Sequence, residues 1–153
     1  VRFTCIDPYR IKITGRTKHF INVFGEELII ENTDKALKSV SKKINCAIVD
    51  YTVAPIFMKD KQKGAHEWLI EFKFPPKDIN YFTELLDNAL KALNSDYEAK
   101  RYNNMTLNPP KINVAKPQQF HNWLESKNKL GGQHKVPRLS NSRTVLEELL
   151  KLM

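Results

Sequence analysis

Hydrophobic and polar residues alternate over residues 1–14, which is the pattern of a β-hairpin. Apolar side chains at positions 1, 3 and 5 share one face of the first run, and an Asp7-Pro8 turn leads into the second run. A third apolar run, residues 20–24, ends at Gly25. We therefore expect a hairpin and a short strand before the first helix.

The middle of the chain changes from helical to strand periodicity. A helix is predicted from about Asn32 or Thr33, either of which can cap it. Two strands follow, residues 47–57 and residues 67–74, and we expect them to pair as an antiparallel hairpin. In the second strand, aromatic and aliphatic residues alternate with charged ones. This alternation predicts one buried face (Trp68, Ile70, Phe72 and Phe74) and one solvated face (Glu67, Glu71 and Lys73).

Three helices and one strand are predicted in the remainder. A long amphipathic helix spans about residues 79–102, and a short strand lies at 112–114. A short helix at 118–127 is anchored by apolar residues (Phe120, Trp123 and Leu124), and a last helix at 144–152 has its own apolar stripe (Val145, Leu149 and Leu152). This order predicts an α+β domain with a small mixed or antiparallel sheet and flanking helices.

The composition fits one globular domain and excludes several other classes. The chain has 153 residues, 41% of them hydrophobic and 27% charged. No apolar run approaches the ~20 residues of a membrane span, and no secretory leader pattern is present. Cys5 and Cys46 stand alone among apolar neighbours, so we expect reduced, buried thiols, no metal site and a cytoplasmic location. We also expect the chain to be a piece of a longer polypeptide.

Positive charge is concentrated in one stretch of the chain. The net charge is +8, and residues 101–143 hold eight basic residues against the single acid Glu125. These basic residues are Arg101, Lys111, Lys116, Lys127, Lys129, Lys135, Arg138 and Arg143. Such a stretch can attract polyanions or can simply be a solvated surface.

The sequence from Gly15 to Glu27 has the organisation of a hinge. It contains Arg16, Thr17, Lys18 and His19, then an apolar strand, then a glycine turn before a helix. This pattern resembles the swivel of the adenylate-forming superfamily, which includes acyl-CoA synthetases and luciferases. The resemblance implies a hinge at about residues 15–27 between a large N-terminal domain and a small C-terminal lid.

Three later motifs narrow the resemblance. Gly64 and His66 open a strand, Asn94, Tyr97 and Arg101 form an N-x-x-Y-x-x-x-R pattern, and residues 133–138 form a Q-x-K-x-P-R block. In this order they resemble the C-terminal domain of the auxin-responsive acyl-acid amido synthetases. The resemblance implies that residues 1–14 continue from a large domain that lies before this chain, and that residues 15–153 are the lid.

The resemblance also implies a two-step reaction. A carboxylic acid and Mg-ATP give an acyl-adenylate, and the amine of an amino acid then gives the amide and AMP. ATP and Mg are the implied cofactors, bound mainly by the large domain, which is the implied partner of this chain. The isolated chain is then expected to be inactive.

Three cations are the candidate residues that face the phosphate or adenylate. Arg143 stands where the wider superfamily has a lysine, and Lys135 and Arg138 belong to the Q-x-K-x-P-R block. An arginine can bind a phosphate through two hydrogen bonds, and phosphate chemistry requires positive charge as the pyrophosphate leaves. The alternative for Lys135 and Arg138 is a surface pair without a chemical role.

Two other functions remain open from the sequence. The basic stretch could bind nucleic acid, with Tyr102, Phe120 and Trp123 as stacking groups, or the domain could serve interaction without chemistry. The helical spacing of Phe120 and Trp123 favours a core role for them and makes nucleic acid the less favoured partner. No Gly-rich phosphate loop and no catalytic triad is present.

Overall fold

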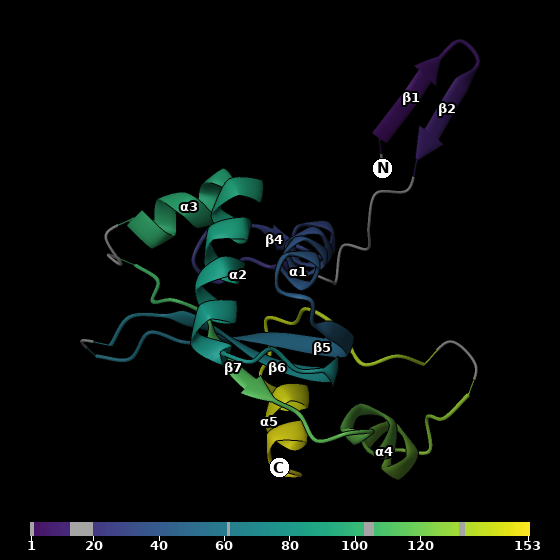
Figure 1. The fold of residues 1–153 in the computed structure, drawn as a ribbon. Coiled ribbons are helices and arrows are strands. Elements are labelled where there is room, and N and C mark those ends of the chain that lie inside the picture. Colours follow the sequence, from purple (N-terminus) through teal and green to yellow (C-terminus); the bar gives the residue numbers. More distant parts are fainter. Residues whose placement is uncertain (1, 13–19, 61, 103–105, 132–133) are drawn as a thin grey trace.

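The computed structural model describes residues 2–12, 20–60, 62–102, 106–131 and 134–153. Its centre is a three-stranded sheet in the order β5-β6-β7 (Figure 1). β5 (Ala47–Ile56) and β6 (Ala65–Phe74) are antiparallel, and β7 (Lys111–Val114) runs parallel to β6. The predicted α+β class with a small mixed sheet is therefore confirmed.

The free edge of β5 is partly closed by a segment near the C-terminus. The Val53 N–H donates to the Arg138 carbonyl at 2.8 Å, and the Ser140 N–H donates to the Val53 carbonyl at 3.1 Å. Leu139 thereby forms a parallel bridge with Val53. Arg138 is thus fixed by its backbone to the sheet.

One face of the sheet is covered by α1 (Ile30–Ile44) and α2 (Ile79–Leu93), which lie above it in Figure 1. The predicted stripe of α2 packs here: Phe82, Leu86 and Leu90 have no exposed surface. They join Trp68 and its neighbours in the larger of two hydrophobic cores. Burial of this apolar surface stabilises the fold.

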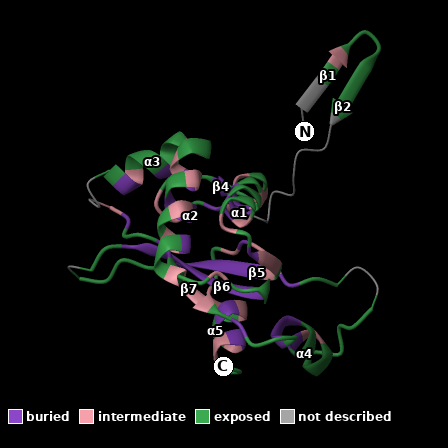
Figure 2. Ribbon diagram, in the orientation of Figure 1, coloured by how far each residue is buried: buried purple, intermediate pink, exposed green. Residues whose placement is uncertain are grey.

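The opposite face is covered by α4 (Gln119–Ser126) and α5 (Thr144–Leu150), below the sheet in Figure 1. Leu69, Phe120, Trp123, Leu146 and Leu149 form the second core there. The purple of buried residues accordingly marks much of β5 and β6 (Figure 2). The anchoring role predicted for Phe120 and Trp123 is confirmed.

The prediction that the charged face of β6 is solvated is correct for Lys73 but wrong for Glu67 and Glu71. Glu67 and Glu71 are only 3% and 6% exposed, because α4 and α5 cover them. Glu71 accepts hydrogen bonds from the backbone N–H groups of Gln118 at 2.8 Å and Phe120 at 3.4 Å, at the start of α4. Conversely, Phe74 was predicted to be buried and is 61% exposed.

Helix boundaries differ from the prediction where polar side chains cap the backbone. The single helix predicted at 79–102 is two, α2 and α3 (Ser95–Arg101), because the Asn94 side chain accepts from the Tyr97 N–H at 2.9 Å. α1 begins at Ile30, and Asn32 reaches back to accept from the Ile29 N–H. The last helix, predicted at 144–152, ends at Leu150, and Leu152 beyond it, predicted to be buried, is 47% exposed.

Two small sheets complete the fold. β1 (Arg2–Ile6) and β2 (Tyr9–Lys12) form the predicted hairpin, which stands away from the other elements in Figure 1. β3 (Phe20–Ile21) pairs with β4 (Leu28–Ile29). Cys46 is buried as predicted, but Cys5 is half-buried, and both thiols are free. None of the helices in the described part of the chain is long and apolar enough to span a membrane.

The bonds between Glu71 and α4 give a stability prediction. Glu71→Ala would leave the buried N–H group of Phe120 and the part-buried N–H group of Gln118 without this acceptor, so we expect the free energy of unfolding to fall by about 1 to 3 kcal/mol. Urea denaturation measures this change. Glu125→Ala, at an exposed position of α4, is the control and should change little. Equal stabilities of the two variants would contradict the capping role.

Candidate functional site

The segment that follows the predicted hinge residues is packed into the domain. Arg16, Thr17, Lys18 and His19 lie outside the described residues, so the structure describes only residues 20–27 of the predicted hinge. Ile21 and Glu26 in that segment have no exposed surface. Residues 20–27 of the predicted hinge are therefore packed in the domain, and the hinge at 15–27 itself stays a prediction.

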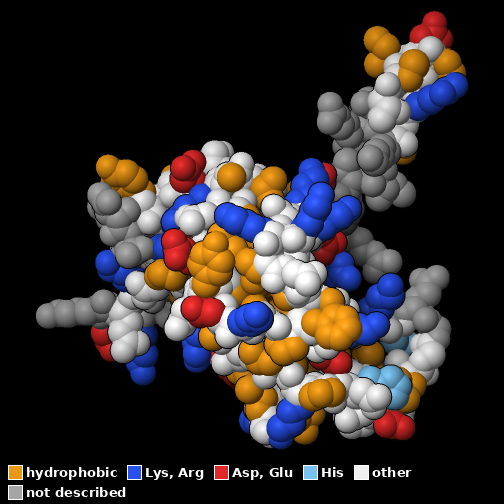
Figure 3. Space-filling model, viewed as in Figure 1, with side chains coloured by type: hydrophobic (Ala, Val, Ile, Leu, Met, Phe, Trp, Pro, Cys, Tyr) orange, Lys and Arg blue, Asp and Glu red, His pale blue; other side chains and the backbone are white. Residues whose placement is uncertain are grey.

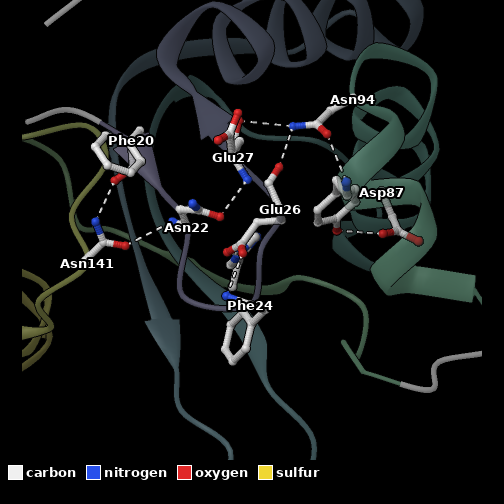
Figure 4. Close-up of polar contacts among 10 residues, drawn as sticks. Phe20, Asn22, Phe24, Glu26, Glu27, Asp87, Asn94 and Asn141 are labelled. Carbon is white, nitrogen blue, oxygen red and sulfur yellow. Dashed lines mark hydrogen bonds and ion pairs between the residues drawn. The ribbon is translucent and has the colours of Figure 1, made fainter. Parts of the chain in front are cut away.

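Glu26 fixes this segment through hydrogen bonds inside the core. Its Oε2 accepts from the Phe24 N–H at 2.7 Å, and its Oε1 lies 2.8 Å from Nε2 of His66 on β6 (Figure 4). Both side chains are fully buried. Burial by itself raises the pKa of Glu26, but the hydrogen bond and attraction of His66, together with backbone hydrogen bonds, lower it below its usual value.

Gly64 permits this close packing. A Cβ atom at position 64 would lie 2.5 Å from two ring atoms of Phe24, closer than real contacts allow. His66 in turn stacks on Tyr97 with ring centroids 5.6 Å apart. The glycine and histidine that open β6 are thus explained by the packing of residues 24–26.

The N-x-x-Y-x-x-x-R residues extend the same network. Asn94 Nδ2 donates to the Glu26 carbonyl at 2.8 Å, and the Tyr97 hydroxyl donates to Asp87 Oδ1 at 2.8 Å (Figure 4). Arg101 binds both carboxylate oxygens of Asp87, at 2.7 and 2.8 Å. Burial raises the pKa of Asp87, but the bonds from Arg101, Lys91 and Tyr97 outweigh it and lower the pKa.

Arg101 therefore does not contribute to a basic surface. It is 6% exposed, and its Nη1 donates to the Leu107 carbonyl at 2.6 Å. Arg101 belongs to the basic stretch in the sequence, but its charge is used inside the domain. The motif residues Asn94, Tyr97 and Arg101 hold α2, α3 and the segment at Glu26 together.

Asn141 is a residue that sequence reasoning missed. Its Nδ2 donates to the Phe20 carbonyl at 3.1 Å, and its Oδ1 accepts from the Asn22 N–H at 3.0 Å (Figure 4). The side-chain amide thus pairs with the backbone on both sides of Ile21 as a neighbouring strand would. No sequence signal identifies this contact, because it joins residues about 120 positions apart.

Arg143, a predicted phosphate-facing residue, lies among carboxylates of the α5 face. Its Nη2 donates to Glu67 at 2.6 Å, its Nε to Glu147 at 3.0 Å, and its Nη1 to the Pro55 carbonyl at 2.8 Å. Its side chain is 21% exposed. Burial raises the pKa of Glu67, but its bonds from Lys111 and Arg143 lower the pKa overall. Arg143 thus compensates a buried charge.

Lys135 and Arg138 are brought together on another side of the sheet. Arg138 Nη1 lies 2.9 Å from both carboxylate oxygens of Asp34, and its guanidinium lies over the Tyr51 ring at 5.2 Å. Lys135 is exposed and close enough to Asp50 to favour its ionised form. The three predicted cations therefore do not converge: Lys135 and Arg138 share the region of Asp50, and Arg143 is separate.

Two of the three aromatic residues considered for nucleic-acid stacking are buried. Phe120 and Trp123 are 4% and 7% exposed. Only Tyr102, at 67% exposed, could stack on a base. This part of the nucleic-acid hypothesis is wrong.

A comparison with models of protein families shows to which family the chain belongs. The family model described as the GH3 family C-terminal domain matches residues 31–144. The chain belongs to the GH3 family. This membership confirms the resemblance to acyl-acid amido synthetases that the sequence motifs indicated.

Solved structures share the fold of this GH3 domain. GH3.15 acyl acid amido synthetase is 19% identical, with a TM-score of 0.70 over 91% of this chain and 25% of that chain. AtGH3.15 acyl acid amido synthetase in complex with 2,4-DB is 18% identical, with a TM-score of 0.68 over 90% and 26%. The GH3 domain described here thus spans about a quarter of these synthetases.

A curated relative matches a smaller part of the domain. Formate–tetrahydrofolate ligase from Malacoplasma penetrans (strain HF-2) is 35% identical over 65 residues. The match covers 42% of this chain and 12% of that protein. This match of 65 residues is shorter than the match of the family model, which covers residues 31–144.

The lowered pKa of Glu26 gives a pH prediction. Stabilisation by its ionised form is complete above the unfolded pKa of ~4.5 and is lost as the pH falls through the lower folded value. Glu26→Gln should therefore be less stable than the wild type at pH 7, and this difference should shrink below about pH 4.5. Denaturant unfolding between pH 3 and 7 measures it.

Glu27→Gln is the matched control, because Glu27 is the exposed neighbour of Glu26. It should follow the wild-type stability curve over the same pH range. A Glu26→Gln variant as stable as the wild type at pH 7 would contradict the structural role of the buried carboxylate.

Proposed function

We propose that this GH3 domain is the C-terminal lid of an ATP-dependent acid–amino acid ligase. The reaction forms an acyl-adenylate and then an amide, and the main active site lies in a larger domain that partners this chain. The observation that carries the proposal is the family match over residues 31–144, joined by a fold shared with acyl acid amido synthetases. On its own, the chain does not catalyse either step.

The proposed hinge lies before Phe20. Residues 20–27 are tied to β6, α3 and Asn141, so they move with the domain as one body. Arg16, Thr17, Lys18 and His19 then separate this body from the β1–β2 hairpin, which continues from the large domain. A few backbone rotations in such a connection are sufficient for domain movement.

ATP and Mg are bound mainly by the large domain in this proposal. The lid adds positive charge where phosphate charge develops and pyrophosphate leaves. Lys135 is the proposed adenylate-facing residue, because it is exposed while Arg143 is engaged by Glu67 and Glu147. The Arg138 guanidinium forms an ion pair with the Asp34 carboxylate.

The substrates are a carboxylic acid and an amino acid. A related synthetase was solved with 2,4-DB, which supports a small organic ligand in the large domain of this protein as well. The two cysteines are free, which is consistent with the proposed cytoplasmic location.

The proposal is tested with the longer protein that joins the large domain to this one. We expect that protein to catalyse acid-dependent pyrophosphate exchange with ATP, and amide formation when an amino acid is added. The 153-residue chain should do neither. Exchange by the chain alone, or tight salt-dependent RNA binding in place of any ligase activity, would contradict the proposal.

Lys135 and Arg143 should respond differently to alanine. In the longer protein, Lys135→Ala should lower kcat about tenfold or more and leave the melting temperature unchanged, because it removes only exposed charge. Arg143→Ala should lower the melting temperature, because Glu67 would keep a buried charge with fewer partners.

The control is Lys129→Ala, another exposed lysine of the basic stretch. It should change neither kcat nor the melting temperature. If Lys135→Ala behaves like Lys129→Ala, Lys135 does not face the adenylate.

A further inference from the structure

A groove of 340 Å³ lies between α1 and the first half of β5, away from the network around Glu26. Leu37, Ala47 and Ile48 provide apolar lining, and Asp34, Lys38, Asp50 and Arg138 bring charges of both signs. Figure 3 shows hydrophobic side chains next to Lys and Arg side chains over the region where Figure 1 draws α1 and β5. The volume is within the ~300–1,000 Å³ of small-molecule sites.

The charges of the groove are not all used within the domain. Arg138 contacts Asp34 through Nη1, and its Nε lies 3.9 Å from Asp50 Oδ1. Among the described residues, no hydrogen bond engages Arg138 Nη2 or Asp50 Oδ2. The Arg138 Nη2 donors and the Asp50 Oδ2 acceptor therefore remain for a ligand.

These groups are held in place by Tyr51. The Tyr51 hydroxyl donates to Asp34 Oδ1 at 2.7 Å, its backbone N–H donates to Asp50 Oδ1 at 2.9 Å, and its ring lies under the Arg138 guanidinium. Burial raises the pKa of Asp50 above its usual value, so this carboxylate gains from a further cation. The arrangement exists before a ligand binds, which reduces the entropy cost of binding.

We propose that this groove binds a free α-amino acid with an apolar side chain. The carboxylate binds Arg138, the ammonium binds Asp50, and the side chain lies on Leu37 and Ile48. An arginine recognises a carboxylate through its planar donors, and a carboxylate accepts from an ammonium.

The mixture of charges excludes simpler ligands. A phosphate or pyrophosphate would meet the carboxylates of Asp34 and Asp50, and a simple amine would meet Arg138 and Lys38. Only a ligand that carries both charges satisfies both sides of the groove. The inference goes beyond the proposed ligase function, because binding is a property of this chain alone.

The test is a titration of the isotope-labelled chain with L-leucine, followed by the backbone amide signals. We expect saturable shifts at Ile48, Val49 and Tyr51. 4-Methylpentanoate, which lacks the ammonium group, and 3-methylbutylamine, which lacks the carboxylate, should each bind at least tenfold more weakly. Pyrophosphate should give no saturable shift at these residues.

Two variants assign the binding to the groove. Asp50→Asn and Arg138→Gln should each weaken leucine binding at least tenfold, and Asp50→Asn retains an acceptor for the Tyr51 N–H. Lys151→Ala, exposed beyond α5, is the control and should bind as the wild type does. No saturable shift with leucine, equal binding of either analogue, preference for pyrophosphate, or undiminished binding by Asp50→Asn would overturn the proposal.

Discussion

The hydrogen bond between Glu26 and His66 joins the first residues of the domain to its central sheet. Neither side chain has exposed surface, so neither can exchange its partner for water. Removing one member of such a buried pair costs roughly 1 to 3 kcal/mol, because the other is left without its hydrogen-bond partner. The turn at residues 24–26 is therefore as much a part of the fold as β6. From it, Asn94 leads to α3 and to the ion pair between Asp87 and Arg101.

The family motifs have a structural explanation in this network. Gly64 gives space to Phe24, His66 pairs with Glu26, and Asn94 caps α3 while holding the Glu26 carbonyl. Gly64, His66 and Glu26 are buried, and Phe24 and Asn94 are half-buried. In the proposed function, the chemistry is left to residues at another part of the surface, near Lys135 and Arg138. A domain that must move as one body needs its first residues to be fixed in this way.

Sequence periodicity predicted most helices and strands, because the periodicity of a strand such as β5 or β6 is a property of its own residues. It did not predict the burial of Glu67 and Glu71. Alternation separates the two faces of β6, but it does not show which elements pack on the charged face. The contacts that cover it come from residues 47 positions (Gln118, before α4) and 76 positions (Arg143, before α5) later in the chain. The break at Asn94 was missed because a capping side chain inside an apolar stripe looks like any polar helix position.

The candidate site was less predictable for a related reason. The sequence identifies cations, but it does not tell which carboxylate each one meets in three dimensions. Arg101 and Arg143 meet buried acids, whereas Lys135 meets solvent. Asn141 left no pattern at all, because two hydrogen bonds from a single amide depend only on tertiary structure.

Native-state hydrogen exchange of the chain tests most directly whether residues 20–27 belong to the folded domain. The Phe24 amide, which donates to Glu26, and the Asn22 amide, which donates to Asn141, are the reporters. If the account is correct, the Phe24 amide exchanges within about tenfold of the slowest amides of β6, and the Asn22 amide is clearly protected. Exchange of both amides at the rate of an unstructured peptide, with β6 still protected, would contradict it.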